Sequence, residues 1–212
     1  MNKNLKYRVD ICIGIDLSKS MQYFLNVLKA GLLNNILIDI KNEMLLLDKT
    51  VDVLRVKFIG FSYQGNSIFP YLNESPFFVY PGQEEELNHF LLNLEIVKSN
   101  EKETPGLEAI ELAIKSKWTD YGNRQKHLII IYSNNECFYS VENFNLLTDL
   151  WDGQDYMSNR SAKRLLIFAP DSNAWTDIAT HWDNTVHYPS RAGDGLAEVD
   201  YQTILSAIVN SI

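Results

Sequence analysis

A carboxylate and two hydroxyls at alternate positions mark one short segment, in which Asp16, Ser18 and Ser20 follow an apolar run that begins at Val9. The run predicts a buried strand and the amphipathic segment after it predicts a helix, so we expect the three side chains on one strand-to-helix turn. Hard oxygen ligands of this kind suit Mg²⁺ or Mn²⁺ better than they suit nucleophilic catalysis. The same pattern also fits ordinary helix capping, in which Ser18 or Ser20 accepts a backbone N–H.

The elements that must position this turn alternate between strand-length apolar runs and helix-period segments, which is typical of an α/β fold with a largely parallel sheet. Strands are predicted at Val9–Asp16, Val51–Phe61, Ser67–Leu72, His127–Ser133, Lys163–Ala169 and Thr185–Tyr188. Helices are predicted from Phe24 towards Leu45, and at Glu84–Leu94, Pro105–Lys117, 141–151, Trp175–Trp182 and Tyr201–Ile212.

One short connection, Gln64–Asn66, fixes the direction of the third strand. It returns the chain antiparallel, because a parallel crossover needs about a dozen residues. The sequence therefore predicts a doubly wound, mostly parallel six-stranded sheet with one antiparallel edge and helices on both faces. In such folds a ligand site lies beyond the carboxyl ends of central strands, and Asp16 falls at that position.

Composition limits the function classes. The chain has 212 residues, a formal net charge of -8 and a pI near 5.0, which predicts one domain over residues 1–212 and argues against nucleic-acid or anionic-membrane partners. No apolar run approaches a membrane span of about 18 residues, and charged Arg8 and Asp10 come too early for a secretory signal. Cys12 and Cys137 show no metal or redox spacing, which favours a reduced, cytoplasmic protein. Cys12 lies four residues before the end of its strand, about 13 Å of strand rise, so a disulfide with Cys137 is out of reach and both should be free thiols.

The D-x-S-x-S turn resembles the metal-ion-dependent adhesion site of von Willebrand factor type A domains, and the resemblance covers essentially the whole chain. It implies a further ligand, a threonine on a loop before a helix, which Thr104 supplies ahead of Pro105. That threonine also fits a plain helix start. The implied site is thus formed by residues far apart in the sequence.

The same resemblance implies Thr-Asp-Gly after the fourth strand, where this chain has Ser133, Asn134 and Asn135. Asn134 offers an amide oxygen but no charge. The implied metal ligands are Asp16, Ser18, Ser20, Thr104 and Asn134, holding Mg²⁺ or Mn²⁺ weakly, and Glu136 is a candidate for a compensating carboxylate.

The function implied by the resemblance is that of a non-enzymatic protein-binding module of the small bacterial kind, similar to those of tellurium-resistance and related stress or defence gene clusters. A partner protein would complete the cation's coordination with an acidic side chain. Two alternatives remain: a metal-free structural subunit with a degenerate site, and a Mg²⁺-dependent phosphotransfer or hydrolytic enzyme. The enzyme alternative lacks a positioned base and a phosphate-binding lysine or arginine.

Aromatic residues are dense between Tyr63 and Tyr80. They fit either a contact surface or an edge hairpin packed on the sheet, and we favour the packed hairpin.

Overall fold

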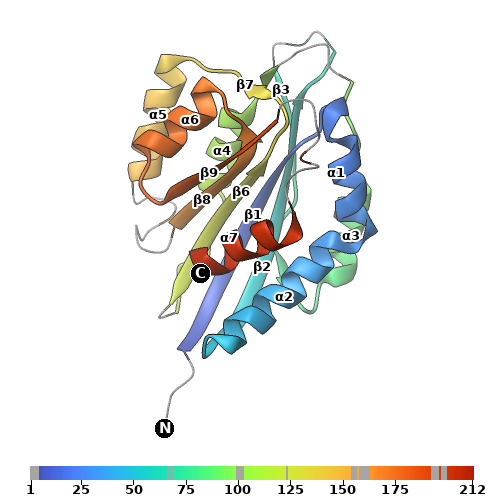
Figure 1. The fold of residues 1–212 in the computed structure, drawn as a ribbon, viewed down its shortest axis with the longest axis vertical. Coiled ribbons are helices and arrows are strands. Elements are labelled where there is room, and N and C mark those ends of the chain that lie inside the picture. The colour runs from blue at the N-terminus through green and yellow to red at the C-terminus, as the bar shows by residue number, and fades with distance from the viewer. Residues whose placement is uncertain are drawn as a thin grey trace.

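The computed structural model describes residues 5–65, 67, 69–98, 103–122, 124–153, 157, 163–191, 196 and 200–212. A seven-stranded sheet lies at its centre, in the order β3-β2-β1-β6-β8-β9, with β4 also paired to β2 (Figure 1). The strands are β1 (Leu5–Asp16), β2 (Lys49–Tyr63), β3 (Pro70–Glu74), β4 (Phe78–Tyr80), β6 (Gln125–Tyr132), β8 (Lys163–Pro170) and β9 (Thr185–Ser190). A separate two-stranded sheet pairs β5 (Glu103–Thr104) with β7 (Glu136–Cys137).

Strand directions confirm the predicted fold class. Strands β1, β2, β6, β8 and β9 run parallel, and β3 is antiparallel to β2. Because β1 occupies the other edge of β2, the short strand β4 shares the outer edge with β3, antiparallel as well. The prediction of six strands missed β4, since three residues are too few to show a periodic pattern. The predicted strand Ser67–Leu72 begins instead at Pro70, and Asn66 and Ile68 lie outside the described residues.

Helices cover both faces of the sheet. One face carries α1 (Gln22–Val27), α2 (Leu33–Leu46), α3 (Glu84–Leu92) and α7 (Tyr201–Ser211), and the other carries α4 (Gly106–Ile114), α5 (Val141–Asp152) and α6 (Asn173–His181) (Figure 1). Each face has its own apolar core, because alternate strand residues point to opposite sides of the sheet. Ile11 and Ile13 of β1, for example, face the first layer, whereas Cys12 between them faces the second.

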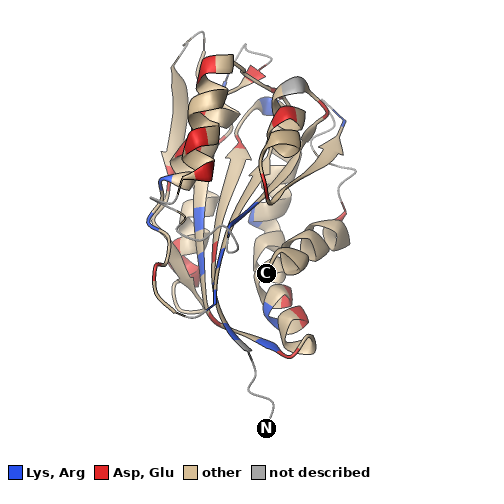
Figure 2. Cartoon of the chain, turned by 90° about the vertical axis from the view of Figure 1, so that its left-hand side faces the viewer, with Lys and Arg blue, Asp and Glu red and all other residues tan. Residues whose placement is uncertain are grey.

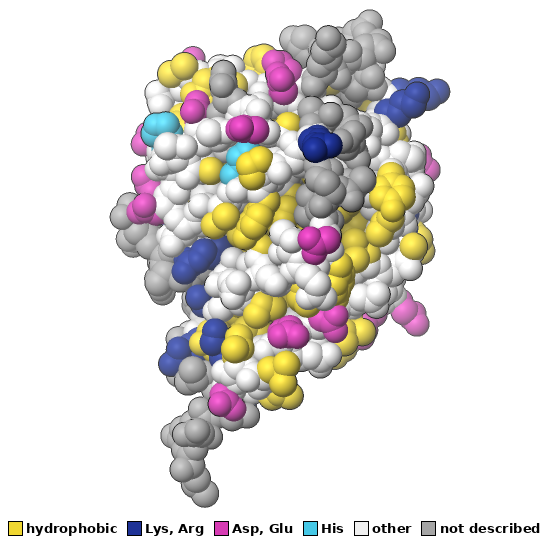
Figure 3. Space-filling model, in the orientation of Figure 1, with side chains coloured by type: hydrophobic (Ala, Val, Ile, Leu, Met, Phe, Trp, Pro, Cys, Tyr) yellow, Lys and Arg dark blue, Asp and Glu magenta, His cyan; other side chains and the backbone are white. Residues whose placement is uncertain are grey.

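The long helix predicted from Phe24 towards Leu45 is interrupted. A π-helical turn at Leu28–Leu32 separates α1 from α2. Gly31 lies in this turn with a φ of 118°, a backbone angle that residues with a side chain rarely adopt. Over the wider segment Lys19–Leu46, length and mean hydropathy match those of a membrane-spanning helix. Its buried side chains pack on the sheet, and apolar residues also reach the surface of this face (Figure 3).

The aromatic segment packs mainly on the sheet, as favoured from the sequence. Phe78 is buried, and Tyr71 and Tyr80 are half-buried against the core. Phe69 is the exception, with 75% of its surface exposed.

Candidate metal centre

Strand β1 ends at Asp16, between β2 and β6, so its carboxylate lies at the carboxyl end of a central strand. The 3₁₀ turn Lys19–Met21 follows directly, with Ser18 as its N-cap residue. The Ser18 side chain makes no capping hydrogen bond; its hydroxyl oxygen instead lies 3.0 Å from that of Ser20. Helix capping therefore does not account for the two serines.

The Asp16 carboxylate is completely buried and accepts hydrogen bonds at both oxygens. Its Oδ1 accepts from the Ser18 backbone N–H at 2.9 Å, and its Oδ2 accepts from the Ser133 hydroxyl at 2.9 Å and the Asn135 amide at 3.0 Å. Burial raises the pKa of Asp16 above its ordinary value, and these hydrogen bonds offset only part of that effect. Among the described residues, no Lys, Arg or His forms an ion pair with Asp16.

Thr104 reaches the same end of the molecule on β5, which pairs in parallel with β7 just after the turn that follows β6. The Phe138 backbone N–H donates to the Thr104 carbonyl at 3.0 Å. The Thr104 hydroxyl is buried and has no hydrogen-bond partner among the described residues, and it does not cap α4. A buried hydroxyl without a partner is costly, so the Thr104 hydroxyl oxygen is suited to serve as a metal ligand.

Close packing fixes this loop. A Cβ at Gly106 would lie 2.2 Å from Trp175 Cη2 and 2.9 Å from Cys137 Sγ. The Trp175 indole N–H in turn donates to the Asn135 carbonyl at 3.1 Å. Glycine at position 106 thus lets the start of α4 and the turn after β6 approach each other.

Cys12 and Cys137 are both buried and not bonded to each other, as expected.

The turn after β6 carries both the predicted ligand Asn134 and two further residues that contact Asp16. Asn134, the implied ligand, is buried, while Glu136 is exposed on β7. Its neighbours Ser133 and Asn135 donate to the Asp16 carboxylate, a role that was not predicted from the sequence. Their position directly after a buried strand that pairs with β1 is the signal that could have found them.

The donor set fits a weakly held hard cation. Ligand oxygens about 2.1 Å from an octahedral Mg²⁺ lie about 3.0 Å apart when adjacent, and the Ser18 and Ser20 hydroxyl oxygens have that separation. Within the described part of the chain, no group of three or more His, Cys, Asp or Glu side chains could hold a metal. The candidate centre therefore depends on hydroxyl and amide oxygens around one carboxylate, and it is poor in negative charge.

No known family profile matches the chain, and no curated protein matches it in sequence. Solved structures do resemble it. A crystal structure of the pilus adhesin SpaC from Lactobacillus rhamnosus GG has a TM-score of 0.58 at 14% identity over 99% of this chain, and proximal thread matrix protein 1 from the mussel byssus has 0.55 at 10% over 97%. The chain spans 31% and 48% of those two proteins.

The conserved hypothetical protein BatB from Bacteroides thetaiotaomicron has a TM-score of 0.50 at 15% identity, with 94% of this chain and 99% of that one covered. At such low identity these likenesses show the fold alone. The fold they share with this chain is consistent with a von Willebrand type A-like arrangement.

Proposed function

We propose that the chain is a non-enzymatic protein-binding module that uses a divalent cation at the carboxyl end of the sheet. The observation that carries the proposal is the buried Asp16 carboxylate without a cationic partner among the described residues. Its neighbours are the paired hydroxyls of Ser18 and Ser20, and the unpartnered hydroxyl of Thr104 lies on a loop at the same end of the sheet. A buried carboxylate is stabilised when it is paired or coordinates a metal.

The cation would be Mg²⁺ or Mn²⁺, held by Asp16, Ser18, Ser20, Thr104 and Asn134. When bound, it supplies a positive centre to which an acidic side chain of a partner protein can bind. Asn134 brings no charge, so binding is weak. The D-x-S-x-S turn, together with the likeness in fold to a pilus adhesin and to BatB, supports assignment to the von Willebrand type A group and, within it, to the small bacterial domains of stress or defence systems.

A metal-free module with a degenerate site is the second candidate, and one observation favours it. Both oxygens of Asp16 already accept hydrogen bonds, from Ser18, Ser133 and Asn135. These three donors hold the carboxylate in place without a cation. Such a module would bind its partner by shape alone.

Calorimetry distinguishes the two candidates. Mn²⁺ is titrated into the wild type, Asp16→Asn and the double variant Ser18→Ala/Ser20→Ala, with circular dichroism as the folding control. The proposal expects binding by the wild type only. Partner capture from host lysate, with and without chelator, then tests whether the cation mediates protein binding. If chelator does not release the captured partners, and folded Asp16→Asn captures them as well as the wild type does, the proposal is contradicted and the metal-free module is supported.

A further inference from the structure

A pocket of about 580 Å³ opens on the α4 side of β2, away from the candidate metal centre. Arg55 and Lys57 of β2 line it, together with Phe77 before β4 and Lys117 after α4. In the parallel register Asp16 pairs with Phe61, four residues beyond Lys57, which corresponds to about 13 Å of strand rise. The pocket is therefore a separate site.

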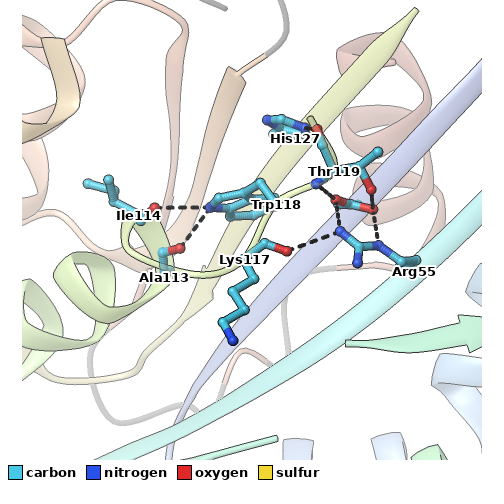
Figure 4. Close-up of polar contacts among 8 residues, drawn as sticks. Arg55, Ala113, Ile114, Lys117, Trp118, Thr119 and His127 are labelled. Carbon is cyan, nitrogen blue, oxygen red and sulfur yellow. Dashed lines mark hydrogen bonds and ion pairs between the residues drawn. The ribbon is translucent and has the colours of Figure 1, made fainter. Parts of the chain in front are cut away.

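Arg55, which lines this pocket, is held by several hydrogen bonds (Figure 4). Its Nε donates to Asp10 Oδ1 at 2.8 Å, its Nη2 donates to Asp10 Oδ2 at 2.5 Å, and Nη2 also donates to the Lys117 carbonyl at 3.2 Å. Asp10 is buried and is fixed in turn by the backbone N–H of Thr119 at 2.7 Å. The remaining nitrogen, Nη1, has no hydrogen-bond partner among the described residues, so its N–H groups can donate to a ligand.

Lys57 supplies a second cation on the same face of β2, about 7 Å along the strand from Arg55. It is only 7% exposed, and its ammonium pairs with Glu74 at 2.5 Å. The side chain of Glu74 is 47% exposed. A lysine ammonium has three N–H donors. Because Glu74 is the one hydrogen-bond partner of Lys57 among the described residues, the ammonium can donate to a further anion.

The aromatic ring of Phe77 lies close to both cations. Its centroid is 4.6 Å from Arg55 Cζ and 6.0 Å from Lys57 Nζ. Phe77 also packs on Trp118, with ring centroids 5.3 Å apart. Together with Leu112 of α4, the ring gives the pocket an apolar wall beside its charged floor.

The charge of the residues that line the pocket is opposite in sign to the net charge of the whole chain, which is -8. Figure 2 shows Lys and Arg positions on strands in the lower half of the molecule, while Asp and Glu lie mainly on helices and loops, with a few on strands. Arg55 pairs with Asp10, Lys57 with Glu74, and Lys115 with Glu111. Lys117 is exposed and forms no ion pair among the described residues. The residues that line the pocket therefore carry more positive than negative charge, although Asp120 outside the lining also acts on Arg55.

We propose that this pocket binds a small molecule that carries an anionic group, carboxylate or phosphate, on an aromatic or aliphatic body. The anionic group accepts charge-assisted hydrogen bonds from Arg55 Nη1 and Lys57 Nζ. The apolar body lies against Phe77 and Leu112. A volume of about 580 Å³ is within the range of small-molecule sites and far exceeds the size of a bare ion.

Calorimetric titration with benzoate, phenyl phosphate and inorganic phosphate tests the proposal. At least one aromatic probe is expected to bind, roughly tenfold more tightly than inorganic phosphate, and the tighter of the two identifies the anionic group. Lys57→Met should weaken binding about tenfold or more, and Lys117→Ala about threefold. Lys6→Ala removes the same charge from an exposed position on β1 and should leave the affinity unchanged, as should a chelator.

Three results would overturn the proposal. They are no heat from either aromatic probe at millimolar concentration, equal affinity for inorganic phosphate, or an equal loss in the Lys6→Ala control. Because Lys57→Met can fail to fold, Lys117→Ala provides an independent measurement: Lys117 is exposed, and only its backbone carbonyl contacts Arg55. Unchanged binding in folded Lys117→Ala, with no shift of the Arg55 Nε–H signal in NMR spectra on adding the probe, would also count against the site.

Discussion

Removing the charge of Asp16 while keeping its shape is the most direct perturbation of the candidate metal centre. In Asp16→Asn, the remaining oxygen can still accept from the Ser18 backbone N–H, and the Ser133 hydroxyl can reverse its role from donor to acceptor. The hydrogen bond from Asn135 is lost, which costs about 1 kcal/mol. The variant also no longer buries a charged carboxylate that lacks a cationic partner, and this gain offsets that cost. It should therefore fold with stability close to that of the wild type.

The two proteins should then differ in their response to metal. If the charge-poor site binds Mg²⁺ with a Kd on the order of 1 mM, about 10 mM Mg²⁺ stabilises the folded state by about 1.4 kcal/mol. For a chain of this length that corresponds to an increase in Tm of about 3–6 °C. Asp16→Asn should show almost none of this increase.

Differential scanning fluorimetry with Mg²⁺ and Mn²⁺, against NaCl at equal ionic strength, measures the effect. Asp52→Asn is the matched control, because it removes the same charge from an exposed position on β2 and should keep the full shift. Equal shifts in the wild type and Asp16→Asn, or no shift in the wild type with either metal, would refute the assignment and leave the metal-free module.

Three further predictions concern the same fold. Asn134→Asp should tighten Mn²⁺ binding about tenfold, equivalent to about 1.4 kcal/mol, in calorimetry; unchanged affinity would remove Asn134 from the ligand set. Gly106→Ala should destabilise the protein by about 1–3 kcal/mol in urea unfolding, because its Cβ overlaps the Trp175 ring, and unaltered stability would show that the packing there is loose. His127 is buried, and its Nε2–H donates to the Thr119 carbonyl at 3.0 Å. Burial lowers the pKa of His127 below its ordinary value of 6.5. The contribution of the neutral side chain to the free energy of unfolding is therefore complete above pH 6.5. It is lost as the pH falls from there through the folded-state pKa, by up to about 1.4 kcal/mol per pH unit. Urea unfolding over that range should show a smaller loss for His127→Gln, and equal losses would contradict this assignment.

The sequence by itself determined the fold class and the local part of the candidate site. Strand and helix periods lie within single segments, so β1, β2, β6, β8 and the antiparallel return near Pro70 could be predicted from adjacent residues. Asp16, Ser18 and Ser20 lie on one turn, where spacing alone brings them together. A short strand such as β4 has no such pattern, and the break at Gly31 follows from a backbone angle that composition does not specify.

Only the tertiary structure decided which distant residues complete each site. The register of β1 with β6 brings Ser133 and Asn135 onto Asp16, and packing of Gly106 against Trp175 holds the Thr104 loop close to the turn after β6. The second pocket arises in the same way: Arg55 and Lys57 share a face of β2, but Phe77 and Lys117 join them from segments about 20 and 60 residues away. Such proximity depends on strand pairing and side-chain packing, which are set by the whole chain rather than by any local run of residues.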